Sequence, residues 1–240
     1  MRESRAGVGA GIESARRGLA TASAALDDGR NRLLFSVALL AVGTVALARV
    51  SPWSEALGAT TGALCVWLAA RSDFWTWPLG IANNLLYLAV FWGSRLYADA
   101  LLQLVYAAIS VYGIWRWRAG RGAAAVRPVE RASARELGLV ALAALVGAAG
   151  LGLVLTGHTD SDVPWADAAT TAVSLAAQWL MSRRMIENWY LWIAVDVVYV
   201  PLYVYKGLHV TAGLYFVFLL LCLVGLRHWR GELAAARAGG

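Results

Sequence analysis

Apolar stretches of about twenty residues recur along the whole chain, and each is bounded by charged residues, Pro or Gly. About 20 mostly apolar residues span the roughly 30 Å hydrocarbon core of a bilayer. The pattern therefore predicts about eight transmembrane helices. They are expected at residues 33–50, 53–70, 75–92, 96–115, 136–156, 165–182, 189–205 and 210–226. Hydrophobic residues make up 60% of the chain and charged residues 15%, so we expect an all-α integral membrane protein.

The basic residues fall mainly on one side of the predicted helices. With a cytoplasmic N-terminus, only Arg49, Arg95 and Lys206 of the 21 Lys and Arg residues lie on the outer side. Basic residues favour cytoplasmic segments, so both termini are predicted to be cytoplasmic and the acidic loop at 158–162 external. This asymmetry accounts for the net charge of +6, and no nucleic-acid partner is expected. The bilayer itself is the expected partner.

The chain contains an internal repeat with a constant offset of 112 residues. The offset aligns Trp77 with Trp189, Asn84 with Asp196, Gly113 with Gly225 and Trp117 with Trp229. Three helices return the chain to the opposite side, so two copies in the same orientation need an inverting helix between them. The segments expected are a tail 1–32, an extra helix 33–50, a first repeat 51–117, a solvated basic linker 118–135, an inverting helix 136–156, a second repeat 164–229 and a tail 230–240.

Parallel repeats of this 3+1+3 kind are a transporter design, with a substrate site at mid-membrane between the repeats. A duplication without transport, in a membrane receptor or scaffold, is the alternative.

Polar residues at the centre of the predicted helices are candidates for the site, because polar groups in hydrocarbon are costly. Trp189, Trp192, Asp196 and Tyr199 share one helical face. Asn84 and Tyr87 form an i,i+3 pair that the repeat places opposite Asp196 and Tyr199. Indole faces attract a cationic ring and a carboxylate can neutralise it, so this face suits a flat cationic ligand with hydroxyl groups. The alternative for Asp196 is a structural hydrogen bond.

Tryptophans near helix ends are typical of an interfacial aromatic belt. That interpretation covers Trp53, Trp75, Trp92, Trp115, Trp117, Trp165 and Trp229, and it remains an alternative for Trp189.

Motifs of soluble and intramembrane catalysis are absent from the sequence. No GxxxxGK[ST], HExxH or GxSxG is present, and the three His residues lack metal-ligand spacing. We therefore expect no enzyme activity, no cofactor and no metal.

Two stretches resemble the signatures of the PnuC family. Residues 178–192, continuing through Asp196 and Tyr199 to Gly207, resemble its ENWxxW region. Residues 80–84, 96–99, 102–103 and 112–115 resemble its other signature, and the similarity covers about residues 53–229.

The resemblance implies a SWEET-like 3+1+3 fold and transport of nicotinamide riboside across a bacterial inner membrane. It implies facilitated diffusion, with a separate cytoplasmic ribosylnicotinamide kinase trapping the vitamin for NAD synthesis. The site residues carried over are Gln103, Asn188, Trp189, Trp192 and Asp196, with Asn84 and Tyr87 opposite. Many members carry Asn where this chain has Asp196, so thiamine and riboflavin remain alternative cargoes. Whether the chain forms a homo-oligomer is open.

Overall fold

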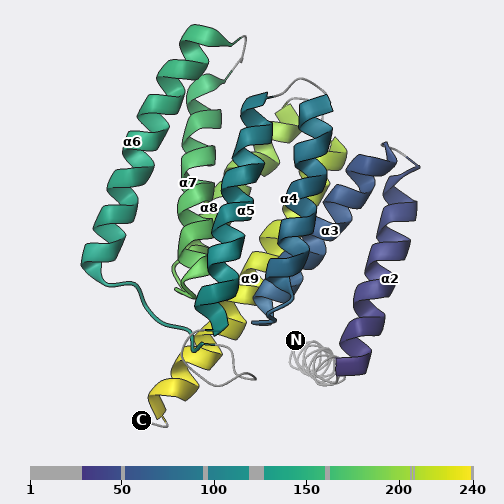
Figure 1. Ribbon diagram of the computed structural model, residues 1–240, viewed down its shortest axis with the longest axis vertical. Helices are drawn as coiled ribbons and strands as arrows, with labels where there is room; N and C mark the ends of the chain where they lie inside the picture. The colour runs from purple at the N-terminus through teal and green to yellow at the C-terminus, as the bar shows by residue number, and fades with distance from the viewer. Residues whose placement is uncertain are drawn as a thin grey trace, which may run out of the picture. The chain divides into compact units, whose positions relative to one another are not determined.

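The computed structural model describes residues 29–49, 52–93, 97–118, 127–159, 163–205, 207 and 209–238. Within these residues the chain forms eight helices and no strand (Figure 1). They are α2 (Gly29–Leu47), α3 (Trp53–Ala70), α4 (Thr76–Gly93), α5 (Tyr97–Arg118), α6 (Ala134–His158), α7 (Pro164–Ser182), α8 (Asn188–Tyr205) and α9 (His209–Ala238). The predicted tail as far as residue 28, the acidic residues at 160–162, Arg95 and Lys206 lie outside the described residues.

The helices begin and end within four residues of the predicted positions, with one exception. Helix α9 continues to Ala238 and not only to residue 226, so residues 230–238 are helical. The apolar run ends at Leu226, but Arg, Glu, Leu and Ala follow, and these residues favour a helix in water as well as in lipid.

By length and composition, α6 and Thr211–Ala238 of α9 are the two helices of the described residues that qualify as membrane spans. The other six are 18 to 22 residues long. At 1.5 Å per residue, 18 residues extend over about 27 Å, close to the thickness of the hydrocarbon core. Several of them carry Trp, Tyr or Asn, and these residues lower the mean hydropathy.

The chain divides into two compact units, Met1–Thr60 and Thr61–Gly240. In the first, α2 approaches the middle of α3 closely at one glycine. A Cβ built on Gly43 would stand 2.9 Å from Cγ2 of Thr60. The Thr60 hydroxyl donates to the Ala56 carbonyl at 2.7 Å, which satisfies this buried polar group within its own helix.

In the second unit, α4 packs along α5, α6 along α7 and α8 along α9, while α7 also contacts α5 and α8. Figure 1 shows α6 running beside α7 and α4 beside α5. Four buried tryptophans, Trp77, Trp117, Trp189 and Trp229, form the centre of the core.

The core contacts recur at the 112-residue offset of the sequence repeat. Trp77 lies against Gly113, and Trp189 lies against Gly225. The Trp117 indole donates to the Met181 carbonyl at 3.2 Å. The equivalent Trp229 indole donates to the Ala69 carbonyl at 3.0 Å. Each of these last two indoles therefore bonds to the end of a helix in the other half of the repeat.

The prediction of an interfacial belt is wrong for Trp117 and Trp229, which are both 0% exposed. Trp117 lies at the end of α5, as the pattern indicated, but Trp229 lies within α9, because that helix continues to Ala238. Both indoles pack against the other half. The remaining five tryptophans of the predicted belt are 53–68% exposed: Trp53, Trp75, Trp92, Trp115 and Trp165.

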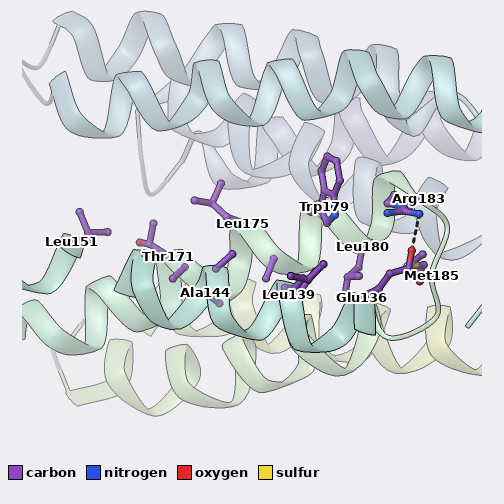
Figure 2. A pocket seen from close by; sticks show the side chains of 15 residues that line it. Glu136, Leu139, Ala144, Leu151, Thr171, Leu175, Trp179, Leu180, Arg183 and Met185 are labelled. Atoms are coloured by element: carbon purple, nitrogen blue, oxygen red, sulfur yellow. Dashed lines mark ion pairs between the residues drawn. The ribbon is translucent and has the colours of Figure 1, made fainter. Parts of the chain in front are cut away.

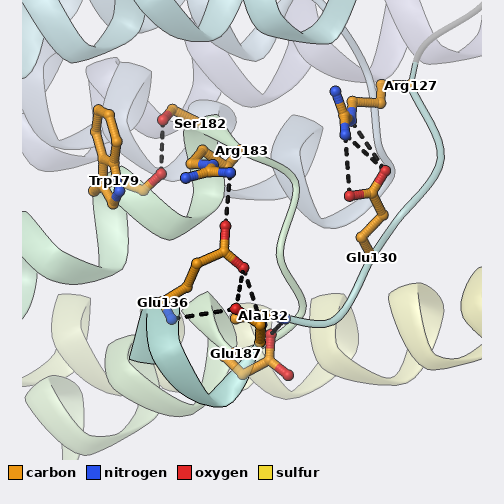
Figure 3. A network of polar contacts seen from close by, with 9 residues as sticks. Arg127, Glu130, Ala132, Glu136, Trp179, Ser182, Arg183 and Glu187 are labelled. Atoms are coloured by element: carbon orange, nitrogen blue, oxygen red, sulfur yellow. Dashed lines mark hydrogen bonds and ion pairs between the residues drawn. The ribbon is translucent and has the colours of Figure 1, made fainter. Parts of the chain in front are cut away.

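The expectation of a solvated linker is also wrong at Val129 and at the Glu130 backbone, whereas Arg131 and Arg135 are exposed as expected. Val129 is 3% exposed. The Glu130 amide donates to the Arg184 carbonyl at 3.1 Å, and the Ile186 amide donates to the Glu130 carbonyl at 3.0 Å. Figure 3 shows this segment beside the turn between α7 and α8, with the Glu187 carboxylate accepting from the Ala132 amide. These backbone contacts therefore fix the position at which α6 begins. There Ser133 and Glu136 form a capping box.

Candidate functional site

The predicted stripe on α8 faces the interior of the second unit. Asn188, Trp189 and Asp196 are buried, and Trp192 and Tyr199 are half-buried. Val197 and Val198, on the other side of the helix, are 54% and 45% exposed. Helical periodicity thus directs the side chains of this stripe inward, while Val197 and Val198 face outward.

Asp196 is a buried carboxylate with one weak hydrogen-bond donor. It is 3% exposed, and the Cys222 thiol of α9 donates to its Oδ2 at 3.5 Å. No basic side chain pairs with it in the described part of the chain. A buried charge is costly unless it is paired or hydrogen-bonded, so Asp196 is suited to receive a cationic or hydroxyl-bearing ligand.

A cluster of tyrosines lies one turn further along α8. Tyr199 and Tyr203 pack on Tyr215 of α9, with ring centroids 4.8 Å and 5.0 Å apart. The Tyr199 hydroxyl donates to Thr170 Oγ1 of α7 at 3.0 Å. Tyr106 of α5 lies beside Ser174 and close to Tyr199. Aromatic side chains from three helices therefore meet next to Asp196.

The first five residues of α8 carry buried polar atoms that have no hydrogen-bond partner among the residues the structure describes. They are Oδ1 of Asn188 and Nε1 of both Trp189 and Trp192. The Asn188 amide is held in place because its Nδ2 donates to the Met185 carbonyl at 2.6 Å. Nearly all buried polar groups in proteins are hydrogen-bonded, so an acceptor and donors of this kind are suited to bind a polar ligand.

Trp189 and Trp192 occupy different environments. Trp189 is fully buried between Gly225 and Trp229, the latter with its ring centroid 5.4 Å away and nearly perpendicular. The structure therefore places Trp189 in the core. Trp192 packs at the edge of this core and keeps part of its ring exposed, so it is the indole of α8 with surface for a ligand.

The remaining predicted residues lie on α4 and α5. Gln103 is half-buried on α5, one turn before Tyr106. Asn84 and Tyr87 are half-buried on α4, where Tyr87 stacks on Phe91 with a centroid distance of 5.5 Å. Helix α4 packs along α5 and is not among the main packing partners of α8 in the described residues. The structure thus brings Asp196 and Tyr199 close to their neighbours on α7 and α9. Asn84 lies on α4, which packs on α5 and not mainly on α8.

Cys222 and Thr170 contact the candidate residues Asp196 and Tyr199, but the sequence did not single them out. The repeat offset aligns Cys222 with Ser110, which is also small, polar and buried. That match was the available signal for Cys222. No comparable signal marks Thr170.

A partly buried ion pair lies against the tryptophan core, at the turn between α7 and α8. Arg184 is 2% exposed and lies 2.6 Å from the Glu232 carboxylate of α9. Its guanidinium carbon is 5.0 Å from the Trp117 ring centroid and 5.5 Å from that of Trp229. Burial lowers the pKa of the Arg184 guanidinium, and the neighbouring Glu232 carboxylate raises it. The pair connects the turn to α5 and α9.

Residues 52–231 match the family described as nicotinamide mononucleotide transporter. The riboflavin/roseoflavin transporter RibM of Streptomyces davaonensis is 32% identical over 180 residues, which cover 74% of this chain and 84% of RibM. The nicotinamide riboside transporter PnuC of Escherichia coli is 26% identical over 202 residues, with the same coverage of 74% and 84%.

Among solved structures, the chain is similar to the crystal structure of the vitamin B3 transporter PnuC. The TM-score is 0.65 at 25% identity, and the match covers 85% of this chain and 92% of that one. Because the family match extends over most of the sequence, it identifies the chain as a membrane transporter and not an enzyme. The chain belongs to the nicotinamide mononucleotide transporter family, the PnuC family.

Proposed function

We propose that the chain carries nicotinamide riboside across a bacterial inner membrane by facilitated diffusion. The observation that carries this proposal is Asp196, a buried carboxylate with no basic partner in the described residues, beside the half-buried Trp192 and Tyr199. A pyridinium ring attached to a ribose fits this set. The indole and phenol faces attract the cationic ring, and the carboxylate neutralises it or accepts from the ribose hydroxyls.

The polar atoms at the start of α8 support a carboxamide-bearing ligand. Asn188 and Trp192 are four residues apart and therefore neighbours on one helical face. Within the described part of the chain, Asn188 Oδ1 is an acceptor without a partner and Trp192 Nε1 is a donor without one. A carboxamide offers an amino group to the first and a carbonyl oxygen to the second.

The proposed architecture is a SWEET-like 3+1+3 arrangement with an extra N-terminal helix, and both termini are cytoplasmic. The repeats are residues 51–117 and 164–229, with α6 as the inverting helix. The recurrence of the Trp77–Gly113 contact as Trp189–Gly225 supports two copies with one internal packing. Transport would follow from rocking of the two copies about the site. A cytoplasmic kinase would then trap the vitamin by phosphorylation for NAD synthesis.

Riboflavin is the second candidate cargo. The observation that favours it is the 32% identity to RibM, together with the Tyr199, Tyr203 and Tyr215 cluster. These rings offer a broad aromatic surface for a larger flat ring. Asp196 would then accept hydrogen bonds from the hydroxyls of the ribityl chain.

The test is uptake of labelled nicotinamide riboside and labelled riboflavin by liposomes containing the purified full chain. We expect saturable uptake of nicotinamide riboside that persists when proton and sodium gradients are collapsed. Saturable uptake of riboflavin that excess nicotinamide riboside does not inhibit would contradict nicotinamide riboside as the cargo. It would support riboflavin instead. Uptake of neither compound would contradict transport of both and leave thiamine as the cargo to test.

A further inference from the structure

An apolar groove of about 650 Å³ runs along the seam between α6 and α7 (Figure 2). Its floor is formed by small residues on both helices, among them Ala144 and Gly147 of α6 and Ala172 and Ala176 of α7. Small side chains leave the seam hollow although the two helices pack along each other. The groove lies within one compact unit and shares no residue with the site on α8.

The groove extends along the first two thirds of α6 and along the C-terminal half of α7. Glu136 and Leu151 mark its extent on α6, and fifteen residues of helix correspond to about 22 Å. Next to it, the outward face of α6 consists of exposed aliphatic residues, such as Leu142, Leu145 and Val146 at 58–69% exposed. Exposed aliphatic surface of this kind is stable in contact with lipid chains.

One end of the groove is basic. Arg183 lies there, 2.7 Å from Glu136, and Figure 2 shows Trp179 beside it. Arg116 of α5 is a second positive neighbour of Glu136. Nε of Arg183 and Nε of Arg116 are buried and have no hydrogen-bond partner in the described residues. Arg183 and Arg116, together with the exposed Arg131 and Arg135 at the start of α6, outnumber the carboxylates of Glu136 and Glu187 at this end.

We propose that this groove binds one anionic phospholipid of the cytoplasmic leaflet. An acyl chain lies between α6 and α7, and the phosphate accepts hydrogen bonds from Arg183 and Arg116. Arginine is suited to phosphate because its planar fork donates two hydrogen bonds. The charge distribution of the sequence places this end at the cytoplasmic side, where anionic lipids attract basic residues. Glu136 positions the Arg183 side chain at the end of the groove.

The charge and the shape of the groove together indicate an anionic phospholipid as its occupant. A hollow lined by apolar side chains along some four turns of helix fits a hydrocarbon chain, and a basic end fits a phosphate with net negative charge. A zwitterionic lipid would fill the groove equally well, but its choline group would oppose the two arginines. The expected consequence is a preference for phosphatidylglycerol over phosphatidylcholine.

The test uses two glycine substitutions on α6. A Cβ on Gly147 would lie 4.0 Å from the Ala172 Cβ, so Gly147→Leu extends a side chain into the groove. Gly150→Leu is the matched control, because a Cβ there would meet no atom within 4 Å and Gly150 does not line the groove. The full chain is prepared in nanodiscs of palmitoyl-oleoyl phosphatidylglycerol and phosphatidylcholine. Retained lipid is then counted by native mass spectrometry, which also reports the oligomeric state.

We expect the unmodified chain and Gly150→Leu to retain one phosphatidylglycerol, and Gly147→Leu to retain none. Arg183→Gln should reduce the preference for phosphatidylglycerol about fivefold, because one phosphate-binding charge is lost. Ala176→Leu fills the groove from α7 and repeats the test if Gly147→Leu fails to fold.

Three outcomes would overturn the proposal. They are equal lipid retention by the groove-filling and control variants, equal retention of the two lipids by the unmodified chain, and a groove-filling variant that changes only the number of subunits. The last result would assign the groove to a second copy of the chain.

Discussion

The indole of Trp189 lies so close to Gly225 that a Cβ on this glycine would stand 2.5 Å from the ring carbons Cη2 and Cζ2. The same relationship holds between Trp77 and Gly113, 112 residues earlier, where the equivalent distance to Cδ2 is 2.7 Å. In each half, therefore, a tryptophan of the second helix of the repeat packs directly against the backbone of the third helix. No other residue than glycine fits without displacement of a large, fully buried ring.

Replacement of either glycine should destabilise the protein. We expect Gly225→Ala and Gly113→Ala each to lower the free energy of unfolding by about 2 kcal/mol, because the added methyl group overpacks a closed core. Scanning fluorimetry of the purified protein in detergent measures this effect as a lower unfolding temperature. The matched control is Gly213→Ala on α9, where a Cβ would meet no atom within 4 Å.

The control variant should not lose stability, and the gain in helix propensity could raise it by up to about 1 kcal/mol. If Gly225→Ala unfolded at the same temperature as Gly213→Ala, the close contact between Trp189 and Gly225 would be contradicted.

The Arg184–Glu232 pair should contribute to stability as a unit. Arg184→Gln removes the cation from between Trp117 and Trp229 and leaves the Glu232 carboxylate without its closest partner at 2.6 Å. We expect a loss of about 2 to 3 kcal/mol, less than for a fully buried pair because the Glu232 side chain is 30% exposed. Thermal unfolding of Arg184→Gln, Glu232→Gln and the double variant measures the coupling.

The double variant should lose less than the sum of the two single variants, because each single change already removes the ion pair. Arg230→Gln is the control: its guanidinium bonds to the Tyr190 hydroxyl at 2.9 Å on the exposed surface, and it should cost at most about 1 kcal/mol. Additive losses would show that Arg184 and Glu232 act independently.

The helices could be predicted from the sequence because their length is set by the apolar runs. The end of α9 could not, since hydropathy indicates where apolar sequence stops and not where the hydrogen-bonded helix stops. The linker was misjudged for a related reason. Composition marks residues 118–135 as basic and polar, but Val129 and the backbone of Glu130 find partners in a turn more than fifty residues away.

The arrangement of the candidate site residues was predicted in part, and the differences have physical causes. The sequence does not distinguish an exposed indole at a helix end, such as that of Trp115, from one that packs against the other half, such as that of Trp117. Periodicity correctly directed Asp196 and Tyr199 inward. It could not supply Cys222 or Thr170, because those contacts join different helices, and Arg184 was interpreted only as a topological charge.

Trp192 should bind the ligand through both its ring and its N–H group. Trp192→Phe keeps an aromatic face but removes a donor that has no protein partner in the described residues. We expect the KM for nicotinamide riboside to rise about fivefold, as for the loss of one hydrogen bond. Trp192→Ala should raise it further because the ring is lost. Trp115→Phe, at a 61% exposed position, is the control. An unchanged KM in Trp192→Phe would exclude the N–H group from ligand binding.

Asp196 should distinguish a cationic cargo from a neutral one. Asp196→Asn preserves the shape of the side chain beside Cys222 but removes its charge. We expect the KM for nicotinamide riboside to rise at least about tenfold, because a hydrogen bond to a charged group contributes more than one to a neutral group. Val197→Ala, on the exposed face of α8, should leave the KM unchanged. If Asp196→Asn instead transported both vitamins as the unmodified protein does, Asp196 would be a structural residue. The cation selectivity proposed here would then have to originate from the aromatic rings alone.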